Sequence, residues 1–304
     1  MPLEDAVRLW SLMGFAQVGD DEVVFTPADV AALTAAQELV ELGILSADRQ
    51  AALVRTWGRS FARLAEWQTA LLATVATESG ADPEQVLPAL TSEVLPRVEA
   101  LQSYVWRRHL VSAGGRQLGV ADSAVAAAPL AVAFVDIVGY TSRSRSLSES
   151  ELVAWIERFE DETTAVVLEH GGRIIKNIGD EVLFVTDDAE SAARAALTLV
   201  RRGLDDADDF PGVRAGVAYG PVVRRLGDVF GETVNIAARL TSAARAGTVL
   251  VDRGSYEALS GRSGDDDQPH PHDPAADPAT DFELRRLRRL AVKGYSRLAA
   301  WSLR

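Results

Sequence analysis

Hydrophobic residues recur every three to four positions through the first 112 residues, which is the spacing of amphipathic helices. The segment 26–43 begins with Thr26 and a proline, a usual N-cap and first helical position, and it ends at a glycine. A second helix is expected from about residue 47, with apolar side chains along one face as far as Val75. In a third apolar stretch, 86–105, two prolines should kink or divide the helix. This part of the chain is therefore predicted to be all-α.

From residue 130 onward the pattern changes to short apolar strands that alternate with helices. The order βαββαβ, followed by further elements, is that of a ferredoxin-like sheet with helices on one face, so the second part is predicted to be α+β. Strands are expected at 130–138, on both sides of a turn at 177–180, at 213–220 with 222–227 as its partner, and at 248–252; helices are expected at 149–170, 188–203 and 231–247.

Composition marks the division between these two parts. Residues 111–130 are rich in Gly, Ala and Ser, so we assign a helical domain to 1–112, a linker to 113–129 and an α+β domain to 130–304. Residues 261–280 are acidic and Pro-rich without apolar periodicity, and we expect them to form a disordered loop.

Composition and charge exclude several classes of site. The chain contains no cysteine, which excludes disulfides, thiolate metal sites and a cysteine nucleophile. Its net charge of −13 opposes nucleic-acid binding, and residues 1–112 hold 8 arginines against 15 acidic residues, which argues against a helix-turn-helix DNA reader. The longest uncharged run has 13 residues, short of the roughly 18 that suggest a membrane span, and the start does not resemble a signal peptide. We expect no membrane span and a cytoplasmic location.

Two aspartates lie at the ends of apolar segments. Asp136 closes the strand at 130–138, and Asp180 follows a tight turn. Either one alone is typical of a turn or cap residue. If the two strands are neighbours in one sheet, both carboxylates can lie at the same edge. Two hard oxygen ligands with open positions suit Mg²⁺ or Mn²⁺ that carries phosphate oxygens.

The loop after the first aspartate is the second candidate. Its sequence places a glycine where the backbone can approach a ligand closely. Its backbone amides can then hold phosphates between the metal and the loop. The residues assigned to this phosphate loop are Ile137, Gly139, Tyr140 and Thr141.

Three further side chains qualify as candidates. Asn235 and Arg239 are four residues apart on one expected helix, so both project from the same face, either as a solvated polar face or as groups directed at a reacting phosphorus. Lys176 is one of only two lysines among the 31 basic residues. A lysine in an arginine-rich chain indicates a position where a compact point donor is needed in place of a planar fork.

Four segments of the chain resemble, in order, the catalytic domain of class III nucleotidyl cyclases. They are FVDIVGYTS, IIKNIGDEVLF, GDVFGETVNIAARL and AVKGYSRLAAWSL, and the resemblance covers about residues 128–304. It implies two metal ions, Mg²⁺ or Mn²⁺, in each site. The implied roles are metal binding by Asp136 and Asp180, purine recognition by Lys176 and Asp228, transition-state stabilisation by Asn235 and Arg239, and contact with the triphosphate by Lys293.

The resemblance also suggests the substrate and the assembly. The ammonium of Lys176 can donate to N1 of adenine while the carboxylate of Asp228 accepts from the exocyclic amine; guanine presents the reverse pattern, so ATP is expected to be converted to 3′,5′-cyclic AMP and pyrophosphate. Class III sites lie between two catalytic domains, one of which supplies the aspartates and the other the remaining residues. A homodimer is therefore expected.

The order of the two domains is similar to that of actinobacterial soluble adenylate cyclases, in which a helical regulatory domain inhibits the catalytic domain and acid pH relieves the inhibition. His109 follows two arginines close to the expected linker. It is either a plain surface histidine or a group whose protonation changes the packing of the regulatory domain.

Two other readings of the motifs remain. One is a catalytically inactive ATP-binding signalling module of the same fold; loss of a metal aspartate or of the Asn/Arg pair would mark it, and neither is lost here. The other is a related sheet used to synthesise cyclic dinucleotides, but the GG[DE]EF motif of those enzymes is missing.

Overall fold

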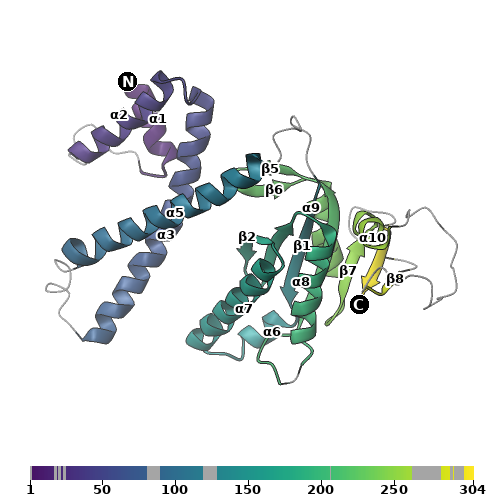
Figure 1. Ribbon diagram of the computed structural model, residues 1–304. Coiled ribbons are helices and arrows are strands. Elements are labelled where there is room, and N and C mark those ends of the chain that lie inside the picture. Colours follow the sequence, from purple (N-terminus) through teal and green to yellow (C-terminus); the bar gives the residue numbers. More distant parts are fainter. Residues whose placement is uncertain are drawn as a thin grey trace. The chain divides into compact units, whose positions relative to one another are not determined.

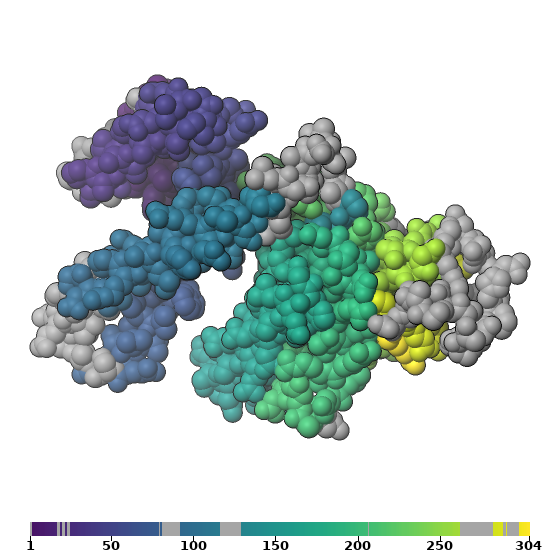
Figure 2. Space-filling model, viewed as in Figure 1, coloured from purple at the N-terminus to yellow at the C-terminus, as the bar shows by residue number. Residues whose placement is uncertain are grey.

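The chain divides into two compact units, Met1–Ser123 and Ala124–Arg304, which are described separately. The computed structural model describes residues 2–16, 19, 22, 25–80, 90–118, 129–205, 207–261, 282–287, 290 and 298–304. The first unit is coloured purple to blue in Figure 1 and Figure 2, and the second runs from teal to yellow.

The first unit is helical, as predicted. The Thr26 amide donates to the Asp29 carboxylate at 2.7 Å, which caps the second helix at the expected residue. Gly58 allows the third helix to pack closely against the backbone of Met13, because any side chain at position 58 would overlap that backbone. The elements are α1 (Leu3–Leu12), α2 (Pro27–Glu41), α3 (Ala47–Ser79), a single π-helical turn η1 (Leu90–Val94) and α5 (Leu95–Leu118).

Helix α5 differs from the expected element at both ends. It begins beside Pro96, one of the two prolines expected to divide this stretch; the other, Pro88, lies outside the described residues. It runs to Leu118, so the first six residues of the expected linker are helical. Gly114 and Gly115 do not end the helix, because glycine weakens a helix by about 1 kcal/mol yet keeps the N–H that proline lacks.

The second unit is built on a seven-stranded sheet in the order β2-β3-β1-β4-β7-β9-β8. Its first four strands are mutually antiparallel, which is the ferredoxin-like arrangement expected from the order βαββαβ. The strands are β1 (Pro129–Ile137), β2 (Arg173–Ile178), β3 (Glu181–Thr186), β4 (Val213–Pro221), β7 (Val249–Asp252), β8 (Leu284–Arg286) and β9 (Ala300–Leu303).

Helices cover both faces of this sheet. On one face, side chains of α7 and α8 pack against alternate residues of β1 such as Ala133 and Val135. On the other face, Ala237 of α9 packs with Val132 and Phe134. The prediction of helices on one face is therefore correct for the βαββαβ core and wrong for the later α9. The helices are α6 (Tyr140–Ser144), α7 (Glu149–Glu169), α8 (Ala189–Arg202), α9 (Glu232–Ala243) and α10 (Arg253–Ser260).

The expected pairing of 222–227 with 213–220 is wrong. Instead, β5 (Val223–Arg225) pairs with β6 (Asp228–Phe230) in a separate two-stranded sheet. The connecting residues Leu226 and Gly227 have φ of 55° and 80°. Two successive positive φ values make the two-residue turn whose twist matches an antiparallel hairpin, so the chain turns back here.

Two other expectations from the sequence are a disordered loop at 261–280 and the absence of a membrane span. The disordered loop expected at 261–280 lies, apart from residue 261, outside the described residues. Among the helices that the structure describes, none is both long and apolar enough to cross a bilayer.

Candidate active site

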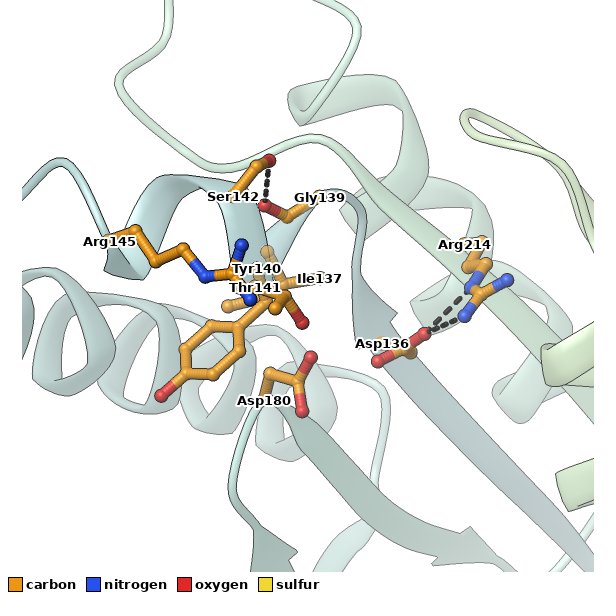
Figure 3. Close-up of a pocket in the computed structure, with 9 residues that line it drawn as sticks. All are labelled: Asp136, Ile137, Gly139, Tyr140, Thr141, Ser142, Arg145, Asp180 and Arg214. Carbon is orange, nitrogen blue, oxygen red and sulfur yellow. Dashed lines mark hydrogen bonds and ion pairs between the residues drawn. The ribbon is translucent and has the colours of Figure 1, made fainter.

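Asp136 and Asp180 line one cleft of about 410 Å³ (Figure 3). Asp136 lies near the end of β1, and Asp180 is in the β2–β3 turn. The amide of Ile137 donates to the Asp180 carbonyl at 3.0 Å, which joins the turn to the strand directly beside Asp136. Sheet pairing thus brings the two carboxylates to one edge. Their assignment as metal ligands stays a prediction.

Arg214 is a cleft residue that the sequence reasoning missed. It lies on β4 directly opposite Asp136, and its Nε and Nη2 atoms are 2.7 and 2.5 Å from Asp136 Oδ2. Its Nη1 also donates to the Ser242 carbonyl at the end of α9, at 3.3 Å. An arginine within the otherwise apolar stretch VRAGVAYG was the signal that could have identified it.

Negative charge is concentrated at this edge of the sheet. Burial raises the pKa of Asp136, and the charge of Asp180 adds to that effect, while the hydrogen bond from Arg214 opposes it. Burial, with the charges of Asp136 and Asp180, raises the pKa of Glu181 to about 7. Glu181 is opposite Asp136 in the sheet and was not singled out from the sequence. Such crowding of carboxylates favours a bound cation.

The phosphate loop is only partly available for a ligand. The amides of Ile137 and Val138 donate to the carbonyls of Asp180 and Gly212, at 3.0 and 2.8 Å. The Ile137 N–H thus already has an acceptor, and the assignment of Ile137 to the phosphate loop stays a prediction. The loop then turns at Gly139, whose φ is +73°. The remaining assigned residues, Gly139, Tyr140 and Thr141, all line the cleft.

Lys176 and Asp228 form a direct ion pair. Lys176 Nζ is 2.6 Å from Asp228 Oδ2. A bulge in β2 places Lys176 opposite Leu183, on the sheet face that α9 covers. Burial alone would raise the pKa of Asp228, but the hydrogen bonds from Lys176 and from the Val229 amide hold it below its ordinary value. The carboxylate thus stays an acceptor.

Comparison with known proteins identifies the family. Residues 124–303 match the adenylate and guanylate cyclase catalytic domain. An adenylate cyclase of Streptomyces coelicolor is 41% identical over 261 residues, which span 84% of this chain and 68% of that protein. The chain belongs to the class III adenylate cyclases.

Two further relatives match the cyclase over a similar share of its length. An adenylate cyclase of Glutamicibacter nicotianae is 39% identical and covers 82% of this chain, and a pH-sensitive adenylate cyclase of Mycobacterium tuberculosis is 36% identical and covers 84%. The matches span 66% of each of these two proteins. The chain therefore spans about two thirds of the length of the relatives that it matches.

Class III cyclases use divalent metal ions, and the donor set of this cyclase fits one. Asp136 and Asp180 offer hard carboxylate oxygens inside a cleft rich in negative charge. Within the described ranges, no group of three or more Asp, Glu, His or Cys residues could hold a metal. A site with two carboxylates leaves positions open for substrate oxygens.

Helix α9, which carries Asn235 and Arg239, runs along the sheet, so its two ends lie at different distances from Asp136. Its last turn is close, because Thr241 donates to the Phe134 carbonyl and Arg214 bonds both the Ser242 carbonyl and Asp136. Its first turn is far. Thr233 at the start of α9 donates to the Pro221 carbonyl, and Pro221 pairs with Pro129 at the start of β1. Asp136 is seven residues further along β1, which at about 3.3 Å per residue is roughly 20 Å. The described residues that line the cleft include none of the four residues Lys176, Asp228, Asn235 and Arg239.

Of the other assigned residues, Lys293 lies outside the described residues. His109 is on α5 of the helical unit, with its side chain exposed. His170 is the C-cap of α7 and does not line the cleft.

Proposed function

We propose that the chain converts ATP to 3′,5′-cyclic AMP and pyrophosphate. The observation that carries the proposal is the ion pair of Lys176 and Asp228, at 2.6 Å. This pair presents a donor next to an acceptor, as the N1 and exocyclic amine of adenine require. Guanine, with a protonated N1 and a carbonyl at the next position, would meet a donor with a donor and an acceptor with an acceptor.

In the proposed reaction the ribose 3′-oxygen attacks the α-phosphorus. The new O3′–P bond forms as the bond from the α-phosphorus to the pyrophosphate oxygen breaks, and the 3′-hydroxyl proton is released. Two divalent ions, Mg²⁺ or Mn²⁺, would polarise the attacking oxygen and neutralise phosphate charge when bound. Asp136 and Asp180 would hold the ions, Asn235 would orient the ribose, and Arg239 would stabilise the charge of the transition state.

The site is proposed to form between two copies of the chain. One copy contributes the cleft of Asp136 and Asp180, and the other contributes Lys176, Asp228 and the residues of α9. None of the four described residues Lys176, Asp228, Asn235 and Arg239 lines the cleft of Asp136 and Asp180, which supports this division, because a nucleoside triphosphate must meet both sets at once. A homodimer then contains two such sites.

The helical unit is proposed to regulate the reaction. One relative is by its name a pH-sensitive adenylate cyclase, and the match to it extends over 84% of this chain, which includes part of the helical unit. We infer that this unit inhibits the catalytic unit and that protonation, with His109 as a candidate group, relieves the inhibition. A cytoplasmic location, where ATP is available, fits this proposal.

The test is to incubate the purified chain with ATP or GTP, with Mn²⁺ or Mg²⁺, at two pH values, and to measure cyclic nucleotide and pyrophosphate. Cyclic AMP, with little cyclic GMP and none from the Asp136→Ala variant, is the expected result. The alternative is an inactive module that only binds ATP. It would bind ATP in calorimetry and release neither product.

A further inference from the structure

Two arginines of the α6 segment differ in their surroundings. The guanidinium of Arg143 lies over the ring of Trp155, 5.8 Å from its centroid, and the same ring stacks on Tyr140 at 6.0 Å. Arg145, two residues later, is the C-cap of α6 and lines the cleft of Asp136 and Asp180. Arg143 thus packs against α7, whereas Arg145 is directed to the cleft.

The two arginines that line the cleft also differ in their hydrogen-bond and ion-pair partners. Arg214 is held by Asp136 through its Nε and Nη2 atoms. Arg145 makes no hydrogen bond or ion pair with the residues that the structure describes, and its side chain is exposed. Figure 3 shows Arg145 and Arg214 on opposite sides of Asp180, with the Arg145 guanidinium turned inward over the cleft. A free guanidinium of this kind is suited to bind an anion.

We propose that Arg145 binds the β- and γ-phosphates of the nucleoside triphosphate. The inference rests on the proposed function, in which the α-phosphorus reacts beside Asp136 and Asp180. Of the two cations among the described residues that line the cleft, Arg145 is the one that no carboxylate holds, so it is available to the β- and γ-phosphates. A guanidinium can donate two parallel hydrogen bonds to phosphate oxygens and stays charged at every working pH.

The competing explanation is that Arg145 is a solvated surface arginine. Arg143 provides the matched control, because it has the same charge, lies on the same short helix and does not line the cleft. Any effect of charge at a distance would be similar for both residues. Only direct contact with the phosphates distinguishes them.

The experiment compares Arg145→Gln, Arg145→Lys and Arg143→Gln in the full chain. Two probes are used as inhibitors of cyclic AMP formation: inorganic tripolyphosphate, which has only the phosphates, and adenosine, which has only the base and sugar. For Arg145→Gln the KM for ATP and the inhibition constant of tripolyphosphate should each rise about tenfold, as expected for loss of one charge-assisted contact. Adenosine inhibition should not change, Arg145→Lys should retain part of the affinity, and Arg143→Gln should behave as wild type.

Equal effects of Arg143→Gln and Arg145→Gln, or an unchanged tripolyphosphate constant for Arg145→Gln, would overturn the proposal. A parallel loss of adenosine inhibition would do the same, since it would show a distorted site. Calorimetry with tripolyphosphate separates this inference from the proposed function. A wild-type chain that binds tripolyphosphate through Arg145 and yet forms no cyclic AMP would support the inference and refute the function.

Discussion

Lys176 Nζ and Asp228 Oδ2 lie 2.6 Å apart, and this contact joins β2 to the β5–β6 hairpin. The two side chains are 43% and 28% exposed, so the pair is open to a ligand and contributes little to stability. Its geometry is set by two local irregularities, the bulge before Lys176 and the tight turn before Asp228. The role of this ion pair in base recognition stays a proposal, which the first prediction tests.

The first prediction concerns this pair. Lys176→Glu combined with Asp228→Cys should lower the kcat/KM for ATP by about 100-fold, because mismatched polar groups in a binding site discriminate strongly. GTP should still be a poor substrate, since the surrounding groups are unchanged. Initial rates with both nucleotides and the thermal midpoint are the measurements. Asp187→Asn breaks a different ion pair of β2, that with Arg173 at 3.6 Å, and is the control for surface charge. Wild-type ATP activity in the double variant would show that these residues do not read the base.

The second prediction concerns the shared site. Asp136→Ala alone should abolish metal-dependent activity, and Arg239→Ala alone should cost on the order of 3 kcal/mol of transition-state stabilisation. Mixed in equal amounts with free exchange, about half the dimers contain one of each, and each of these has one intact site of two. The mixture should therefore recover about a quarter of wild-type activity. If subunit exchange is demonstrated and activity stays at the sum of the separate variants, the site is not shared.

The third prediction concerns regulation. Residues 120–304 should be more active than the full chain by about fivefold or more at neutral pH, the size of a typical coupling between sites. The difference should narrow as the pH falls from 8 to 5.5, because histidine gains its proton in that range. His109→Gln should flatten the profile of the full chain, while His170→Gln, at the C-cap of α7, serves as control. Identical pH profiles of the two lengths would exclude a regulatory role of the helical unit.

The fourth prediction concerns the support of α9. A Cβ at Gly216 of β4 would overlap the backbone of Ala237 and Thr241 on α9. Gly216→Ala should lower the free energy of unfolding by about 1–3 kcal/mol and also lower kcat, because the helix that carries Asn235 and Arg239 must shift. Urea denaturation and initial rates are the measurements.

The control for this substitution is Gly220→Ala on the same strand. Its Cβ would meet the Thr233 hydroxyl at 3.0 Å, whereas a Cβ at Gly216 would lie only 2.4 Å from the Thr241 backbone, so the effect should be smaller. Equal stability and kcat of Gly216→Ala and wild type would show that α9 does not depend on this close contact.

The sequence by itself determined the local elements and the residues of the motifs. Thr26 and Pro27 mark the start of α2, and the apolar runs at 130–138 and 248–252 predict β1 and β7, because caps and periodicity act within a few residues of the backbone. The resemblance added roles for side chains already present in the motifs, and family membership is confirmed by the match over 124–303.

Only the tertiary structure decided which side chains meet. Arg214 is 78 residues from Asp136 in the chain, yet antiparallel pairing of β1 and β4 makes them direct neighbours, so the pair depends on strand register and not on any local pattern. The sequence likewise did not show which face of the sheet α9 covers. In the structure α9 packs closely against Gly216 of β4, which decides the face. Contact between β1 and the β2–β3 turn also gave the Ile137 amide a backbone acceptor, the Asp180 carbonyl. Contacts between distant segments depend on strand register and on packing, and local patterns along the sequence specify neither.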